Sequence, residues 1–81
     1  MKVIVYTTDN CPKCKMTLRR FGEFGVNPKI ITDSVSTRSI LAGMGYLSYP
    51  VVQVYEGSKM IDNWCDNRPD KIAELFNKEK R

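Results

Sequence analysis

The sequence has 81 residues, of which 42% are hydrophobic and 27% charged, a composition typical of a small globular protein and not of a disordered tail. A chain of this length buries only roughly 60% of its unfolded surface, so we expect one core and a single domain over residues 1–81. Its 13 basic and 9 acidic residues are scattered along the chain and do not gather with stacking aromatic residues. This pattern argues against a nucleic-acid-binding protein.

The first six residues give one lysine followed by a run of four apolar residues. This run is too short for a secretory signal or a membrane span, so we expect a cytoplasmic protein without a membrane anchor. In the cytosol, thiol pools keep cysteines reduced. The three cysteines of the chain therefore indicate redox chemistry or metal binding before structural crosslinks.

The first half of the chain alternates strand and helix patterns. The apolar, β-branched residues 3–6 predict a strand buried on both faces. Apolar positions at helical spacing predict a helix over residues 12–24, which Gly25 ends. Residues 29–32 predict a second strand, and residues 36–44 predict a second helix that Gly45 ends.

The second half of the chain predicts a hairpin followed by a helix. Residues 51–55 read as a strand, and the three-residue turn after them is too short for a parallel crossover, so residues 59–63 form an antiparallel partner. Pro69 suits the first turn of a last helix, whose Ile72, Leu75 and Phe76 share one face. The order β-α-β-α-β-β-α predicts an α/β fold, a four-stranded mixed sheet flanked by three helices that cover both faces.

Cys11 and Cys14 lie where the first predicted strand passes into the first predicted helix. A helix N-terminus presents unpaired N–H groups and a partial positive charge, which stabilise a thiolate over a thiol, and Lys13 adds a further positive charge. Cys11 begins the helix and should be exposed, whereas Cys14 lies on the apolar stripe and should face inward. We therefore expect Cys11 to attack and Cys14 to resolve.

This asymmetry predicts a dithiol-disulfide oxidoreductase that reduces protein disulfides. The Cys11 thiolate attacks a substrate disulfide, and Cys14 then displaces the reduced substrate and closes the Cys11–Cys14 bond, without any bound cofactor. A structural disulfide over so short a loop would contribute only about 2 kcal/mol. A structural zinc site needs four ligands, usually Cys or His, and the chain has three Cys and no His, so we expect no metal.

Four segments stand in an order and spacing that are specific as a set: Val5-Tyr6-Thr7, Cys11-Pro12-Lys13-Cys14, Gly45-Tyr46-Leu47-Ser48-Tyr49-Pro50-Val51-Val52, and Trp64 through Arg68-Pro69-Asp70-Lys71-Ile72. On these segments the chain resembles the NrdH-type redoxins, glutaredoxin-like members of the thioredoxin superfamily. The resemblance implies a thioredoxin-like fold, reduction by NADPH through thioredoxin reductase, and electron delivery to ribonucleotide reductase. We expect a monomer.

The resemblance also implies roles for single residues. The family proline that matches Pro50 is cis and faces the redox pair, and the backbone before it, at Tyr49, pairs with substrate peptide as an added strand. Arg68 is expected to tie the loop around Trp64, although Trp64 also reads as a core aromatic. Lys13, Tyr49, Pro50, Trp64 and Arg68 are thus the candidate substrate-binding residues.

The chain departs from the family at one segment. The family run Trp-Ser-Gly-Phe-Arg-Pro reads here Trp64-Cys65-Asp66-Asn67-Arg68-Pro69, which puts the fit to the usual reductase in doubt and is compatible with a divergent, phage-encoded branch. Cys65 stands where the family has Ser, so we expect it to be dispensable.

The source of electrons depends on this same segment. Glutaredoxins place a Gly-Gly pair here, against which glutathione docks, and this chain has none. Side chains at positions 65–67 should hinder glutathione, and the charge of Asp66 should repel its carboxylates, so thioredoxin reductase is favoured. A glutathione-dependent glutaredoxin stays open because Asp66 is similar to an Asp that some glutaredoxins use near glutathione. A redox-regulated peptide-binding module without turnover is the third interpretation.

Overall fold

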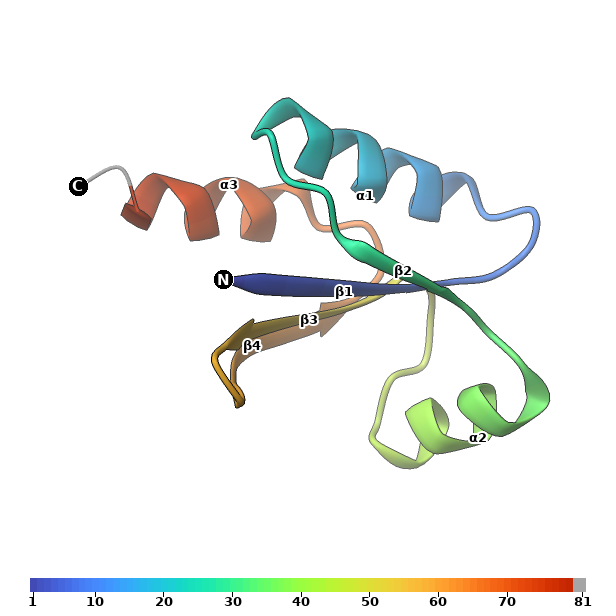
Figure 1. Cartoon of the computed structure of the whole chain (residues 1–81). Helices are drawn as coiled ribbons and strands as arrows, with labels where there is room; N and C mark the ends of the chain where they lie inside the picture. The colour runs from blue at the N-terminus through green and yellow to red at the C-terminus, as the bar shows by residue number, and fades with distance from the viewer. Residues whose placement is uncertain (80–81) are drawn as a thin grey trace.

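The structure is a computed structural model that describes residues 1–79, with side chains through Phe76 (Figure 1). Its elements are β1 (Lys2–Thr7), α1 (Pro12–Glu23), β2 (Lys29–Thr32), α2 (Val35–Gly43), β3 (Val51–Glu56), β4 (Lys59–Cys65) and α3 (Pro69–Glu79). The predicted order β-α-β-α-β-β-α is confirmed, and the ends of the elements lie within two residues of the predicted ones. Within the described residues, no helix is long and apolar enough to cross a membrane.

The four strands form one mixed sheet in the order β2-β1-β3-β4. The pair β1–β2 is parallel and the hairpin pair β3–β4 is antiparallel, as the sequence predicted. The pair β1–β3, whose direction was not predicted from the sequence, is antiparallel. The predicted burial of the first strand on both faces is wrong. Val3 and Val5 are buried at 5% and 0% exposure, whereas Ile4 and Tyr6 on the other face stay partly exposed.

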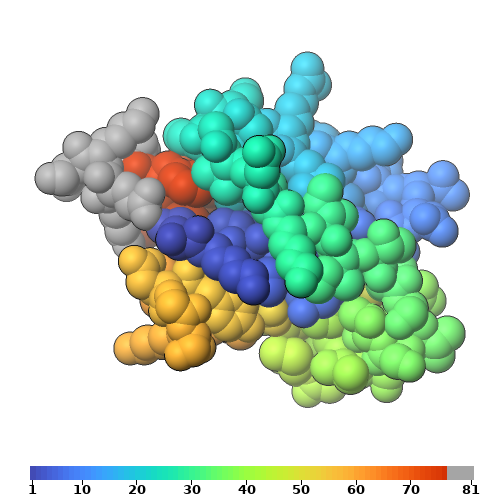
Figure 2. Space-filling view, in the orientation of Figure 1, coloured from blue at the N-terminus to red at the C-terminus, as the bar shows by residue number. Residues whose placement is uncertain are grey.

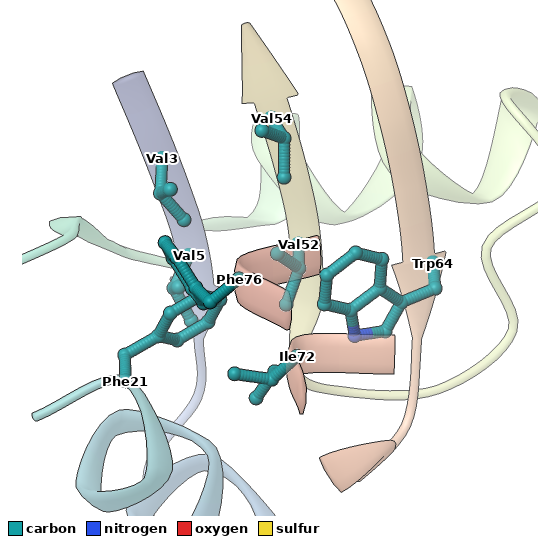
Figure 3. Close-up of a cluster of buried hydrophobic side chains, with 8 residues drawn as sticks. All are labelled: Val3, Val5, Phe21, Val52, Val54, Trp64, Ile72 and Phe76. Carbon is teal, nitrogen blue, oxygen red and sulfur yellow. The ribbon is translucent and has the colours of Figure 1, made fainter. Parts of the chain in front are cut away.

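The helices lie on both faces of the sheet, with α1 and α3 on one face and α2 on the other (Figure 1). The main core fills the space between the sheet and the α1–α3 pair (Figure 3) and consists of Val3, Val5, Phe21, Val52, Val54, Trp64, Ile72 and Phe76. Phe76 of α3 contacts two rings of the α1 segment, Phe21 edge-on at 6.2 Å and Phe24 stacked at 5.1 Å between centroids. These contacts fix α1, and with it the cysteine pair, on the sheet.

The opposite face carries α2, which buries only one residue, Leu41. The helix begins at Val35, one residue before the predicted start, because the Ser34 hydroxyl caps it by accepting the Thr37 N–H at 3.2 Å. The chain turns after the helix at Gly45, whose φ of +96° suits glycine. In the space-filling view α2 and the turn after it (green) lie across β1 (blue) from α1 (cyan) (Figure 2).

Candidate active site

The register of the sheet gathers three chain segments at one edge. Tyr6 of β1 pairs with Val51 of β3, and Val51 pairs with Cys65 of β4. The residues that follow β1, precede β3 and follow β4 therefore lie side by side. This edge of the sheet holds the loop into the cysteine pair, the Tyr49–Pro50 segment and residues 66–68.

Cys11 and Cys14 form a disulfide at the start of α1, with their Cα atoms 5.2 Å apart. Cys11 is the N-cap residue of the helix, and Pro12 occupies the first turn, where a missing N–H costs nothing. The main-chain N–H of Cys14 donates to the Cys11 sulfur at 3.1 Å. The first turn of α1 contains no acidic residue, so the field at Cys11 favours a thiolate once the pair is reduced.

The two sulfurs differ in accessibility. Cys14 is 3% exposed, as expected for a residue on the inner side of the first helical turn. Cys11, which was predicted to be exposed, is partly exposed. Cys11 is therefore the sulfur that another protein can reach.

The Tyr49–Pro50 peptide bond is cis, as the family resemblance implied. Pro50 is fully buried, and its carbonyl oxygen accepts the main-chain N–H of Asp66 at 2.9 Å. This hydrogen bond continues the β3–β4 pairing by one residue beyond Val51 and Cys65. It ties the segment before β3 to the loop after β4.

The loop after β4 also contacts α1. The Lys13 ammonium lies 2.8 Å from the Asp66 carboxylate, and the Thr17 hydroxyl donates to the Asn67 side-chain oxygen at 3.3 Å. The hydrogen bond from Lys13, and a second one from the Asn67 N–H, lower the pKa of Asp66 below its ordinary value. The Asp66 carboxylate, which was expected to repel the carboxylates of glutathione, is therefore ionised and paired with the Lys13 ammonium.

Trp64 lies in the core, and Arg68 pairs with an acidic residue at the start of α3. Trp64 is 6% exposed and packs in the core beside Ile72 (Figure 3). The Lys71 ammonium lies 5.5 Å from the centre of the Trp64 ring. Arg68 donates from Nε and Nη2 to the Asp70 carboxylate at 3.1 and 2.9 Å. Arg68 therefore braces the start of α3, and its charge also acts on Asp66 in the loop that follows Trp64.

Tyr49 lies in the wall of a pocket of about 240 Å³ between α2 and the segment before β3, lined by Arg38, Leu41, Ala42, Tyr46, Leu47, Ser48, Tyr49 and Val51. Its hydroxyl is buried, and burial together with the charge of Asp33 raises the pKa of Tyr49. Asp33 accepts hydrogen bonds from Arg38 Nε and Nη2 at 3.0 and 2.8 Å. Sequence reasoning missed Asp33 and Arg38, because a charged pair near a helix start is ordinary surface composition.

Cys65 is a free, partly exposed cysteine at the end of β4, where it pairs with Val51 in the sheet. It lies next to Asp66 in the chain and so belongs to the same edge of the sheet as the cysteine pair. No bond joins it to the other two cysteines.

A paired dithiol at a helix start, on this sheet and with these helices, makes the protein a thiol-disulfide oxidoreductase with a thioredoxin-like fold. Within that class it is similar to NrdH-redoxin from Escherichia coli, with 28% identity and a TM-score of 0.79 over 93% of this chain and 95% of that one. The resemblance predicted from the sequence is thereby confirmed.

More distant structures share the fold. The glutaredoxin from Archaeoglobus fulgidus matches with 24% identity and a TM-score of 0.66 over 93% of this chain and 85% of that one. Thioredoxin from Plasmodium falciparum matches with 16% identity and a TM-score of 0.65 over 95% of this chain and 83% of that one. Comparison with protein-family models gives no match, and comparison with curated protein sequences gives none either.

Proposed function

We propose that the protein is a cytoplasmic dithiol reductant that takes electrons from NADPH through thioredoxin reductase and delivers them to ribonucleotide reductase. The observation that carries the dithiol reaction is the unequal burial of the two cysteines at the start of α1, with Cys14 at 3% exposure and Cys11 partly exposed. The reductase and the target rest on the similarity to NrdH-redoxin. Tyr49 and Pro50 supply the neighbouring backbone for a substrate strand, and Lys13 flanks the attacking sulfur.

The reaction follows from this arrangement. The Cys11 thiolate attacks one sulfur of the substrate disulfide, and the other substrate sulfur leaves as a thiolate that takes up a proton. Cys14 loses its proton, attacks the Cys11 sulfur of the mixed disulfide and releases the second substrate thiol. Two electrons have then passed to the substrate, and the Cys11–Cys14 disulfide awaits reduction. Cys65 takes no part, because the pair already forms a complete two-electron couple.

Two features support thioredoxin reductase over glutathione as the electron source. The main-chain N–H groups that follow β4 already have partners, since Asp66 donates to the Pro50 carbonyl and Asn67 donates to the Asp66 carboxylate. They are not free to receive a glutathione carboxylate. In addition, the similar Escherichia coli protein is described as glutaredoxin-like with a thioredoxin-like activity profile.

The test oxidises the protein and follows reduction of the Cys11–Cys14 disulfide with two systems. One contains NADPH and thioredoxin reductase, and the other contains NADPH, glutathione reductase and glutathione. We expect efficient reduction by the first system only. Efficient reduction by glutathione alone would make the protein a divergent glutaredoxin, and reduction by neither, with retained peptide binding, would favour a binding module.

The target is tested separately with a ribonucleotide reductase that depends on an external dithiol. We expect the protein, recycled by thioredoxin reductase, to sustain many turnovers of nucleotide reduction, and the Cys14→Ser variant to sustain none. If the protein reduces insulin disulfides steadily but does not sustain nucleotide reduction by ribonucleotide reductase, the proposed electron source stands and the proposed target is rejected.

A further inference from the structure

The backbone of Asp66 is left-handed, and this conformation does not require an Asp side chain. Its φ is +75°, in the left-handed region where glycine fits without strain and where Asp and Asn are the tolerated alternatives. The backbone geometry alone would thus be served at least as well by glycine, which the resembling family carries at this place. A role for the carboxylate has to come from what it contacts.

The carboxylate contacts the redox motif itself. Its Oδ1 lies 2.8 Å from Nζ of Lys13, the residue between Pro12 and Cys14, and it also accepts the Asn67 N–H at 2.7 Å. The main chain of Asp66 is anchored by its hydrogen bond to the Pro50 carbonyl. The position of the anion is therefore fixed from two sides, and the Lys13 ammonium lies beside it.

The pair contributes little to folding. The side chains of Lys13 and Asp66 are 57% and 44% exposed, and exposed ion pairs are screened by water. The pair can instead affect the balance between thiol and thiolate at Cys11. A cation beside a thiol favours the thiolate and an anion disfavours it, so the balance between these two charges acts on Cys11.

We propose that Asp66 is a positioning residue that limits the thiolate fraction of Cys11 by holding the Lys13 ammonium. The inference rests on the proposed role of Cys11 as the attacking thiol. An unpaired Lys13 would stabilise the thiolate and thus the reduced dithiol form, which makes the disulfide a stronger oxidant. That direction is unfavourable for a protein that donates electrons, and pairing with Asp66 opposes it.

The test compares the unsubstituted protein with Asp66→Asn, Lys13→Gln and the double variant, all reduced. Asparagine tolerates the left-handed backbone, so the loop is kept. The rate of alkylation of Cys11 by iodoacetamide is followed against pH, with mass spectrometry to assign the modified cysteine. On the acidic limb of the profile we expect Asp66→Asn to react roughly two- to threefold faster, the size of effect that loss of one nearby charge has in a high dielectric.

The other variants show in which direction each charge changes the alkylation rate of Cys11. Lys13→Gln should react more slowly by a similar factor, and the double variant should lie close to the unsubstituted protein because both charges are gone. In a glutathione redox buffer, Asp66→Asn should also be the more oxidising protein. Glu23→Gln removes an equal charge from the exposed Arg20–Glu23 pair at the far end of α1 and is expected to leave the profile unchanged.

Each outcome bears on the inference. An unchanged or slower Asp66→Asn variant would overturn it, and an equal shift in Glu23→Gln would reduce it to an effect of net charge. Alkylation of Cys14 before Cys11 in the unsubstituted protein would instead contradict the proposed roles of the two cysteines. Suppose that thioredoxin reductase fails to reduce the protein but Asp66→Asn still shifts the reactivity of Cys11. This result would support the positioning role of Asp66 and reject only thioredoxin reductase as the electron source.

Discussion

Cys11 and Cys14 are three residues apart in the chain, yet their surroundings differ because a helix begins between them. Cys11 is the last non-helical residue, with its sulfur at the open end of α1, while Cys14 points from the first turn toward the core. We therefore expect a partner disulfide to reach Cys11, with Cys14 close behind it. We expect the local backbone to give the two identical side chains different roles, one attacking and one resolving.

The first prediction tests that division. Cys14→Ser should trap a mixed disulfide between Cys11 and an oxidised substrate, since no second thiol is left to displace it. Cys11→Ser should form at least tenfold less adduct, because the remaining thiol is buried. Non-reducing electrophoresis and peptide mass spectrometry give both results. A comparable adduct on Cys14 in the Cys11→Ser protein would show that the roles are reversed.

Asp33 supplies a second prediction, on pH. Its side chain is 6% exposed, and the hydrogen bonds from Arg38 lower its pKa below the ordinary value of about 3.9. A carboxyl with a lowered folded-state pKa stabilises the protein above its unfolded pKa, and the contribution is lost as the pH falls through the folded-state value. Asp33→Asn should therefore lower Tm at pH 7, and the difference should shrink below about pH 4.

Thermal unfolding at pH 7 and pH 3, followed by circular dichroism, measures the Tm of both proteins. Asp9→Asn removes an exposed carboxylate from the loop after β1 and is the charge-matched control, with little change expected at either pH. A Tm difference for Asp33→Asn that persists undiminished at pH 3 would point to packing and not to the charge.

The residues of the site were predictable to unequal degrees. The cysteine pair follows from its spacing and its place before a helix, and the cis bond before Pro50 followed from the family resemblance. The Lys13–Asp66 pair did not, because only the completed sheet brings the loop after β4 beside the first turn of α1. The family glycine at position 66 could have indicated the positive φ that the structure shows there, but not the ion pair.

At the scale of elements, periodicity located every helix and strand, and pairing decided where each one ends. The last strand continues two residues beyond its predicted end at residue 63 because Trp64 and Cys65 find partners in Val52 and Val51. No local propensity of residues 64–65 carries that information. The same extension places Trp64 in the core and delivers Asp66 to the site.

The α1–α3 pair supports the site through its packing on the sheet, and Ile72 tests this. Ile72 of α3 is fully buried in the core, whereas Ile40 of α2 is 64% exposed. Ile72→Ala should lower the free energy of unfolding by about 2–5 kcal/mol, from lost burial and the cavity it leaves. Ile40→Ala, the same substitution in another helix, should change it by no more than about 0.5 kcal/mol.

Urea unfolding of the oxidised proteins, followed by Trp64 fluorescence, gives both values. Similar losses in the two variants would mean that the α2 face is covered in solution, and a small loss at Ile72 would mean that the core between the sheet and α3 is loose.

At the scale of the whole molecule, the two faces of the sheet are unequally covered. The rule for parallel crossovers predicted helices on both faces, and the structure confirms it. The inequality was not predictable, because apolar residues at helical spacing look alike whether or not a partner covers them. In α2 and just after it, Val35, Ile40 and Met44 are 86%, 64% and 52% exposed, and Leu41 alone is buried.

This imbalance predicts how stability is distributed. Segments with few buried apolar contacts open by local unfolding at a lower free energy than the core does, so the amides of α2 should exchange hydrogen much faster than those of β3 and α1. Native-state hydrogen exchange with mass spectrometry, repeated at low urea, measures both. Protection of α2 equal to that of β3, with the same dependence on urea, would show that the molecule unfolds only as a whole.

The expected difference matters for the site because its two halves are built on different faces. The disulfide belongs to α1, which the main core holds, whereas the pocket beside Tyr49 has α2 as one wall. Opening of α2 would therefore change the pocket without moving the sulfurs. Saturating the protein with an oxidised substrate peptide that reaches the pocket should slow exchange in α2 and leave β3 unchanged, and equal slowing in both would assign the effect to global stabilisation.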